Sequence, residues 1–222
     1  MHLLNRIFLV NSLLVVLVTV ERTTPITRVV LQPHAFLSLH QLVQTCVLIL
    51  ASVVTLYWTF HAVSGPRHRW LSIIFVAGTY LYGAGEGLHE LASYLLQSRC
   101  GGSLCDSLFV DDFYTGNILF FVGAFLMTAS LLIAERLQPS STFGRRDVAL
   151  LSVNAVVFAA TVVAYAAFDT VLVGLVFALV TMVFSLAMAI PVRREPLRHP
   201  VTLYTVITYT VGSVVAVALR LF

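Results

Sequence analysis

Three ionisable side chains, Glu86, His89 and Glu90, interrupt a long apolar run over residues 70–97. Their spacing of three and four residues places all three on one face of a helix. Two carboxylates this close repel each other unless a proton, a metal ion or a cationic partner compensates their charge. Glu86 and His89 also have the one-turn spacing by which helical bundles present a carboxylate and an imidazole to one ion. We therefore predict a metal or cation site with Glu86 and His89 as its primary ligands.

Other polar side chains lie where the neighbouring apolar runs begin. His40 and Asp112 occupy such positions, and Glu21 and His34 precede the second run. We expect Glu90 and Asp112 to support the ion and His40 to be an optional further ligand. Imidazole and carboxylate ligands of this kind favour a divalent metal such as zinc or iron. A metal-bound water would then make the protein a hydrolytic or oxidative enzyme.

The composition defines the environment of these residues. Of the 222 residues, 59% are hydrophobic and only 10% are charged, and the mean hydropathy is +0.95. A soluble domain carries about 25% charged residues, so the composition predicts an all-α, polytopic integral membrane protein. Disordered and disulfide-framework classes are excluded because charge, proline and cysteine are scarce. A net charge of only +3, carried mainly by the loops, gives no support to nucleic-acid binding.

Seven apolar runs are long enough to be transmembrane helices, because a helix needs about 20 apolar residues to cross the hydrocarbon. The fifth and sixth runs are separated only around Asp169, which predicts a tight turn there. We interpret the first run as an uncleaved helix rather than a signal peptide, because no small-residue cleavage site follows it. The runs form a single transmembrane domain over residues 1–222 and cover about 4–20, 37–63, 70–97, 115–134, 148–167, 170–190 and 200–222.

The placement of arginine predicts the orientation. All 13 basic residues are arginines, and alternating loops place nine of them on the side of the N-terminus and four on the opposite side. By the positive-inside rule the N-terminus is cytoplasmic, whereas the C-terminus and loops 21–36 and 98–114 lie outside a plasma or inner membrane. Glu86 then lies about 16 Å from the outer end near Gln97, close to the midplane. Expected partners are membrane lipid and other membrane subunits.

Other interpretations of the polar cluster stay open. Titratable groups inside a membrane also serve as a proton or ion relay. A buried glutamate and histidine can instead form a structural hydrogen-bond network, as in an accessory subunit of a larger membrane complex. A haem held by His40 and His89 is disfavoured, because the two imidazoles would differ in depth by roughly 8 Å. The sequence therefore leaves open whether the protein is an enzyme.

The cysteines and glycines predict two local contacts. Cys100 and Cys105 lie in the predicted external loop, where an oxidising compartment favours a disulfide. Structural zinc normally needs four ligands, more than these two thiols provide. Gly83, Gly85 and Gly87 alternate beside the polar face of the third run. We expect these glycines to let a neighbouring helix approach closely.

The segment from His89 to Asn117 resembles part of the seven-helix, zinc-dependent membrane hydrolases related to alkaline ceramidases. The resemblance covers the helix count, His89 and one of Asp111 and Asp112. That family places two histidines four residues apart in its last helix, and residues 201–222 contain no histidine. The predicted orientation is also the reverse of that family's. We therefore do not assign the chain to it.

Overall fold

The computed structural model describes residues 3–31, 37–64, 68–140 and 142–222. Over these residues the chain folds into helices, and its only β-type pairing is a single bridge between Val30 and Ser38. Seven of the helical segments are long and apolar enough to cross a membrane, the number that the sequence predicts. The chain is therefore an all-helical protein with seven candidate transmembrane helices.

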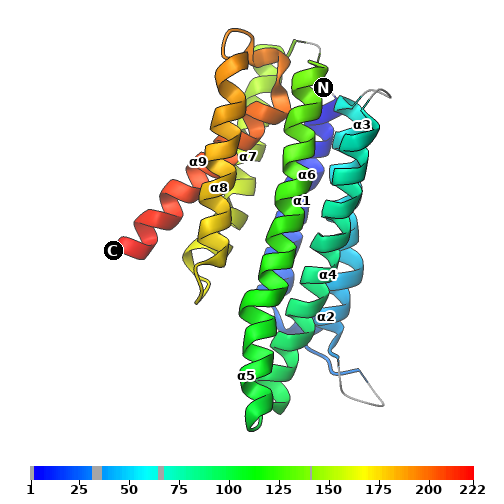
Figure 1. The fold of residues 1–222 in the computed structure, drawn as a ribbon, viewed down its shortest axis with the longest axis vertical. Coiled ribbons are helices and arrows are strands. Elements are labelled where there is room, and N and C mark those ends of the chain that lie inside the picture. The colour runs from blue at the N-terminus through cyan, green and yellow to red at the C-terminus, as the bar shows by residue number, and fades with distance from the viewer. Residues whose placement is uncertain (1–2, 32–36, 65–67, 141) are drawn as a thin grey trace.

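The helices alternate in direction along the bundle (Figure 1). The start of α1 and the connections near residues 138–140, 142–144 and 190–199 share one end, and the connections near 24–31, 37–38, 100–102 and 168–172 share the other. The α-helices are α1 (Leu3–Thr23), α2 (Leu39–Leu42), α3 (Ile49–Val63), α4 (Arg69–Arg99), α5 (Ser103–Val110), α6 (Asn117–Leu137), α7 (Arg145–Ala167), α8 (Val173–Ala189) and α9 (Pro200–Leu221).

Two π-helical segments make longer rods from shorter helices. Segment η2 (Val43–Leu48) joins α2 to α3, and η3 (Asp111–Gly116) joins α5 to α6. Short 3₁₀ turns follow α1 and α8 and precede α9, namely η1 (Pro25–Thr27), η4 (Ile190–Val192) and η5 (Pro196–Arg198). Each of these 3₁₀ turns contains a proline, whose fixed φ and missing N–H suit the first turn of a helix.

The predicted external loops are more helical than expected. Helix α1 continues to Thr23, and most of the predicted loop 98–114 is helix, because α4 extends to Arg99 and α5 begins at Ser103. Gly102, with φ of 58°, makes the sharp turn between them, and the predicted Cys100–Cys105 disulfide closes it. The aspartates of this segment suggest a loop, but its leucines and phenylalanine continue the apolar face of a helix. The structure does not describe residues 32–36 of the other predicted loop.

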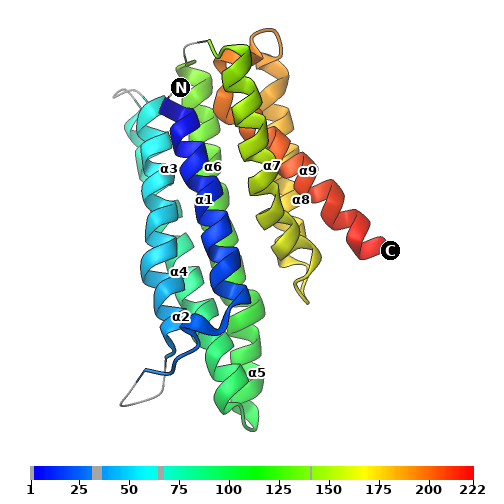
Figure 2. The same ribbon diagram turned by 180° about the vertical axis from the view of Figure 1, so that it is seen from behind.

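The helices form two groups that share the core. Helices α1, α3, α4 and α6 lie on one side, and α7, α8 and α9 on the other (Figure 2). Helix α4 packs along α6, and α7 packs along α9. Side chains such as Phe121 from α6, Val162 from α7 and Phe177 from α8 are buried where the two groups meet. This boundary between the groups contains the cavity described below.

Glycines set the closest helix approach. A Cβ atom on Gly85 would lie 2.2 Å from the backbone nitrogen of Phe120, and one on Gly123 would lie 2.3 Å from that of Tyr82. The backbones of α4 and α6 are therefore in direct contact. Gly83 and Gly87 have no atom near such a Cβ, so only the middle glycine of the predicted trio makes the contact.

Candidate functional site

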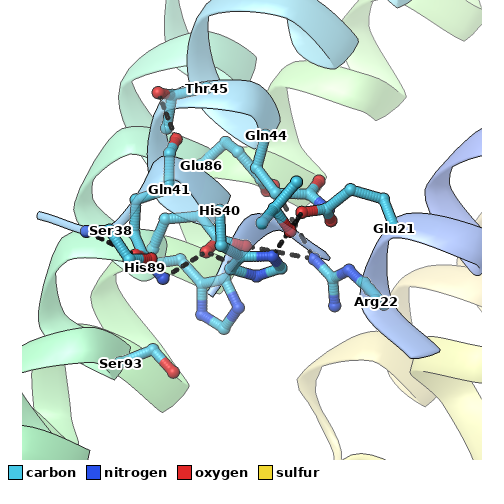
Figure 3. A network of polar contacts seen from close by, with 12 residues as sticks. Glu21, Arg22, Ser38, His40, Gln41, Gln44, Thr45, Glu86, His89 and Ser93 are labelled. Carbon is cyan, nitrogen blue, oxygen red and sulfur yellow. Dashed lines mark hydrogen bonds and ion pairs between the residues drawn. The ribbon is translucent and has the colours of Figure 1, made fainter. Parts of the chain in front are cut away.

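A cluster of charged and amide side chains lies where α1 ends beside the start of α2 and the C-terminal half of α4 (Figure 3). We call it the polar network, and it consists of Glu21, Arg22, His40, Gln41, Gln44, Glu86 and Glu90. All of these except Arg22 and His40 are buried. The network therefore joins the first three candidate spans at one end of the bundle.

Glu21, in the last turn of α1, holds one end of the network. Its carboxylate accepts hydrogen bonds from the Thr27 hydroxyl at 2.5 Å and from the Gln44 amide. Nδ1 of His40 lies 2.6 Å from the same carboxylate, and its Nε2 lies 3.6 Å from Glu90. The imidazole of His40 therefore links two carboxylates that come from different helices.

Arg22 supplies the permanent positive charge of the network. One guanidinium nitrogen lies 3.2 Å from Glu90 and 3.9 Å from Glu86. The first distance is a charge-assisted hydrogen bond, and the second is too long for one. The Arg22 side chain is 49% exposed, whereas those of Glu86 and Glu90 are 9% and 5% exposed. Arg22 therefore compensates part of the negative charge of Glu86 and Glu90, for which the sequence predicts a metal ion or another cation.

Local sequence signals position the amides. Ser38 is the N-cap of α2, and Gln41, three residues later, completes a capping box in which both residues bond to each other. The other end of the Gln41 amide reaches Glu90 at 3.5 Å. Gln44 lies in η2 and Asp112 in η3. Single π-helical turns are frequent at functional sites, and both of these turns carry a polar side chain of the region.

His89 and Asp112 form a pair of their own. Nδ1 of His89 donates to the backbone carbonyl of Asp112 at 3.0 Å. The Asp112 carboxylate oxygen is only 2.8 Å away, but that oxygen lacks hydrogen-bond geometry. We therefore treat the carbonyl as the hydrogen-bond acceptor and the carboxylate as the ionic partner. This pairing engages His89 with η3 rather than with the carboxylates of the network.

The predicted metal ligands thus divide into two sets. Glu86 and Glu90 share Arg22, and His40 lies beside Glu90, whereas His89 and Asp112 pair with each other. In the part of the chain that the structure describes, no group of three or more His, Cys, Asp or Glu side chains is placed to hold a metal ion. His34 lies outside the described residues. The predicted common coordination sphere is therefore not seen, because a cationic side chain lies between the carboxylates.

The network lies near the end of α1. Arg22 contacts Glu86 and Glu90 from the last turn of α1, a helix of 21 residues. At 1.5 Å per residue this turn is about 30 Å from the start of α1, a distance comparable to the hydrocarbon thickness. Glu86 is therefore level with the end of α1 instead of its middle. The end of α4 and the whole of α5 project beyond the end of α1 (Figures 1 and 2).

A cavity of about 620 Å³ extends from the network into the boundary between the two helix groups. Its polar end contains Glu86, His89, Arg22, Asn117 and Asp169, and Asn117 donates a hydrogen bond to Asp169 at 3.4 Å. Its walls are mostly apolar and aromatic, and they include three tyrosines. These wall residues include Leu48, Phe120, Phe121, Phe158, Phe177, Tyr82, Tyr165 and Tyr209.

Sequence reasoning missed Arg22 and the role of Asp169. Arg22 belongs to the predicted first external loop, and nothing in the local pattern pairs it with acids on the third span. Asp169 is predicted only as a turn, and the structure places it in the lining of the cavity. A signal was available for Arg22, since it is one of the few arginines on the side opposite the N-terminus. Finding its partners still requires knowing that α1 ends beside α4.

Comparisons with protein families, with curated proteins and with solved structures found no match to this chain. The fold and the site define a seven-helix, membrane-type bundle with a charged cluster at the mouth of an apolar cavity. The chemistry of that cavity indicates what the protein can bind.

Proposed function

We propose that the protein binds an amphipathic molecule within the membrane, with a cationic amine head at the polar network and an apolar tail in the cavity. The supporting observation is the position of Glu86. Its carboxylate lies at the polar end of a 620 Å³ cavity, and Arg22, which is 3.9 Å away, is closer to Glu90. Cavities of about 300–1,000 Å³ with apolar walls and a few convergent polar groups are typical of small-molecule sites.

The charge of the mouth favours a cationic head. Of the three carboxylates of the network only Glu86 lines the cavity, where it lies beside the guanidinium of Arg22 and near His89, whose partner is Asp112. Asp169 adds a further carboxylate to the cavity lining. A carboxylate accepts up to about four hydrogen bonds, and burial makes an unpaired charge costly. An ammonium group donates three hydrogen bonds and supplies the missing positive charge, so it fits Glu86 in both respects.

The walls of the cavity favour an apolar tail. Phe121 and Phe177 stack with ring centroids 4.8 Å apart, and Tyr165 packs against both. Aromatic surfaces of this kind bury alkyl groups at about 25 cal/mol per Å² of apolar area. One molecule that combines a cationic head with an alkyl tail therefore satisfies both ends of the cavity.

Three probes with the same tail and different heads test this proposal. Binding of dodecylamine, dodecanol and dodecanoic acid is measured on the purified full-length protein in lipid nanodiscs. We expect the amine to bind at least about tenfold more tightly than the alcohol, which corresponds to about 1.4 kcal/mol. Glu86→Gln should reduce this preference to less than about threefold while the alcohol binds as before. If dodecanoic acid binds more tightly than the amine and the alcohol, the proposal is wrong, because the site would then prefer an anionic head paired with Arg22.

A matched control separates the site from general electrostatics. Glu195, at the opposite end of the bundle, pairs with Arg198 and has a side chain that is 60% exposed. Glu195→Gln removes the same charge without touching the cavity, so the amine preference should persist. An equal loss of preference in both variants would show that the effect comes from net charge and not from the mouth of the cavity.

The earlier hypotheses remain predictions with their own tests. A divalent metal enzyme requires stoichiometric zinc or iron in the purified protein, which elemental analysis measures. A proton or ion relay requires flux in proteoliposomes that Glu86→Gln abolishes. An accessory subunit requires a larger complex, which native gel migration detects.

A further inference from the structure

A second recess lies at the opposite end of the bundle, between the end of α3 and the start of α4. It has a volume of about 380 Å³. Its lining combines a basic rim with a phenylalanine floor and consists of Tyr57, Phe60, His61, Ser64, His68, Arg69, Ser72, Phe75 and Val76. We call this recess the basic groove.

The polar lining of the basic groove consists of hydrogen-bond donors suited to an anion. Arg69 contributes a guanidinium, His61 and His68 contribute imidazoles, and Ser64 and Ser72 contribute hydroxyls. None of the described lining residues is acidic. A planar guanidinium pairs well with phosphate oxygens, because two of its N–H groups can donate in parallel. The donor set therefore matches a phosphate group better than a cation or a neutral molecule.

Tyr57 holds His61 in place at the rim of the groove. The Tyr57 hydroxyl lies 2.6 Å from His61 Nε2, and the two rings pack edge to face with centroids 4.5 Å apart. Phe60 and Phe75 form the floor, with stacked rings 4.7 Å apart, and both are buried. The groove thus joins a fixed polar rim to an apolar base, an arrangement that accommodates a charged head group with an attached hydrocarbon chain.

The aromatic residues around the groove place it at a membrane surface. Trp58 and Trp70 flank it on α3 and α4 and are 54% and 49% exposed. Tryptophan is enriched at the membrane–water interface, where the head groups lie.

We propose that the basic groove binds a phosphate-bearing anion, supplied either as the head group of an anionic phospholipid or as free phosphate. The site is separate from the cavity at the polar network, and it stands or falls independently of the amine-binding proposal. Arg69 pairs with the phosphate, and the two histidines and the serines complete its hydrogen bonds. When the anion is a lipid, its acyl chains lie over Phe60, Phe75 and Val76.

Native mass spectrometry of the purified full-length protein tests the proposal with dioleoyl phosphatidylglycerol, dioleoyl phosphatidylcholine and inorganic phosphate as separate probes. We expect the anionic lipid to bind more tightly than the zwitterionic one. Arg69→Gln should weaken the anionic lipid about fivefold, the effect of about one interfacial arginine. Arg145→Gln, which removes an exposed arginine at the same end and outside the groove, should change it by less than about twofold.

Ser72→Asp provides a second variant that keeps Arg69 and places a carboxylate in the groove, and it should weaken the anionic lipid at least as much as Arg69→Gln. Displacement of the lipid by inorganic phosphate would support the site and assign free phosphate as its ligand. Failure of phosphate to displace it would support the site and assign the lipid head group. Equal binding of the two lipids, or equal losses in Arg69→Gln and Arg145→Gln, would overturn the proposal.

Discussion

Replacement of Glu135 provides a quantitative test of how the bundle positions its last helix. Glu135 lies near the end of α6 and is 0% exposed. Its carboxylate accepts hydrogen bonds from the backbone N–H groups of Val201 at 2.7 Å and Thr202 at 2.8 Å, and from the Thr202 hydroxyl at 2.8 Å. The first N–H groups of a helix have no partner within it, and a negative charge there is favourable. Glu135 thus caps α9 from a neighbouring helix.

The expected loss follows from the donors that are left unpaired. In Glu135→Ala the two backbone N–H groups lose their acceptor at a buried site, at about 1–3 kcal/mol each. The free energy of unfolding should therefore fall by about 4 kcal/mol. Glu135→Gln keeps one carbonyl oxygen as acceptor and should lose about half of that. For chains of this length, 1 kcal/mol changes Tm by about 2–4 °C, so Glu135→Ala should lower Tm by about 8–16 °C.

The assay is thermal unfolding of the detergent-purified variants under identical conditions. Glu195→Ala serves as the control, because its ion pair with Arg198 at 2.9 Å is exposed and such pairs contribute about 0–1 kcal/mol. We expect the order wild type, Glu195→Ala, Glu135→Gln and Glu135→Ala in falling Tm. A Glu135→Ala variant as stable as the control would refute the capping role.

Two further predictions concern helix packing and pH. Gly85→Ala should lower the free energy of unfolding by about 1–3 kcal/mol, because the added Cβ would lie 2.2 Å from the α6 backbone. Gly87→Ala should leave the free energy of unfolding unchanged or raise it by up to about 1 kcal/mol. Equal Tm values for the two variants would contradict the contact between α4 and α6. Burial lowers the pKa of His199, and the positive charge of Arg198 lowers this pKa further. As the pH falls, the unfolded chain therefore binds a proton at His199 before the folded chain does. The Tm of the wild type should therefore fall relative to that of His199→Gln as the pH falls through about 6.5. If the Tm values of the two proteins change with pH to the same extent, this prediction is wrong.

Much of the fold follows from local rules. The apolar runs predict seven spans because each must bury its backbone polar groups in a helix before it enters the hydrocarbon. The boundary around Asp169 follows from the break between two such runs. The helical segment before Asn117 does not follow from local rules, because Asp106, Asp111 and Asp112 are residues typical of a loop. The disulfide and the apolar face that keep this segment helical are seen only in the structure.

The site was predictable only in part. The spacing of Glu86 and Glu90 places both on one helical face, and they do share a partner. The identity of that partner depends on where α1 ends relative to α4, which no local pattern encodes. The glycines show the same limit, because residues two apart on a helix point in very different directions. Only Gly85 of the three can therefore face α6.

Photolabelling is the most direct measurement of whether the cavity holds an amphipathic amine. A dodecylamine analogue with a diazirine at the end of its tail is irradiated in nanodiscs, and the labelled residues are identified by mass spectrometry. The proposed function predicts labels on Phe121, Phe158 and Phe177, which line the cavity. Labels confined to outward-facing residues of α8 such as Val176 and Val180 would contradict it, because the molecule would then lie in the surrounding lipid and not inside the protein.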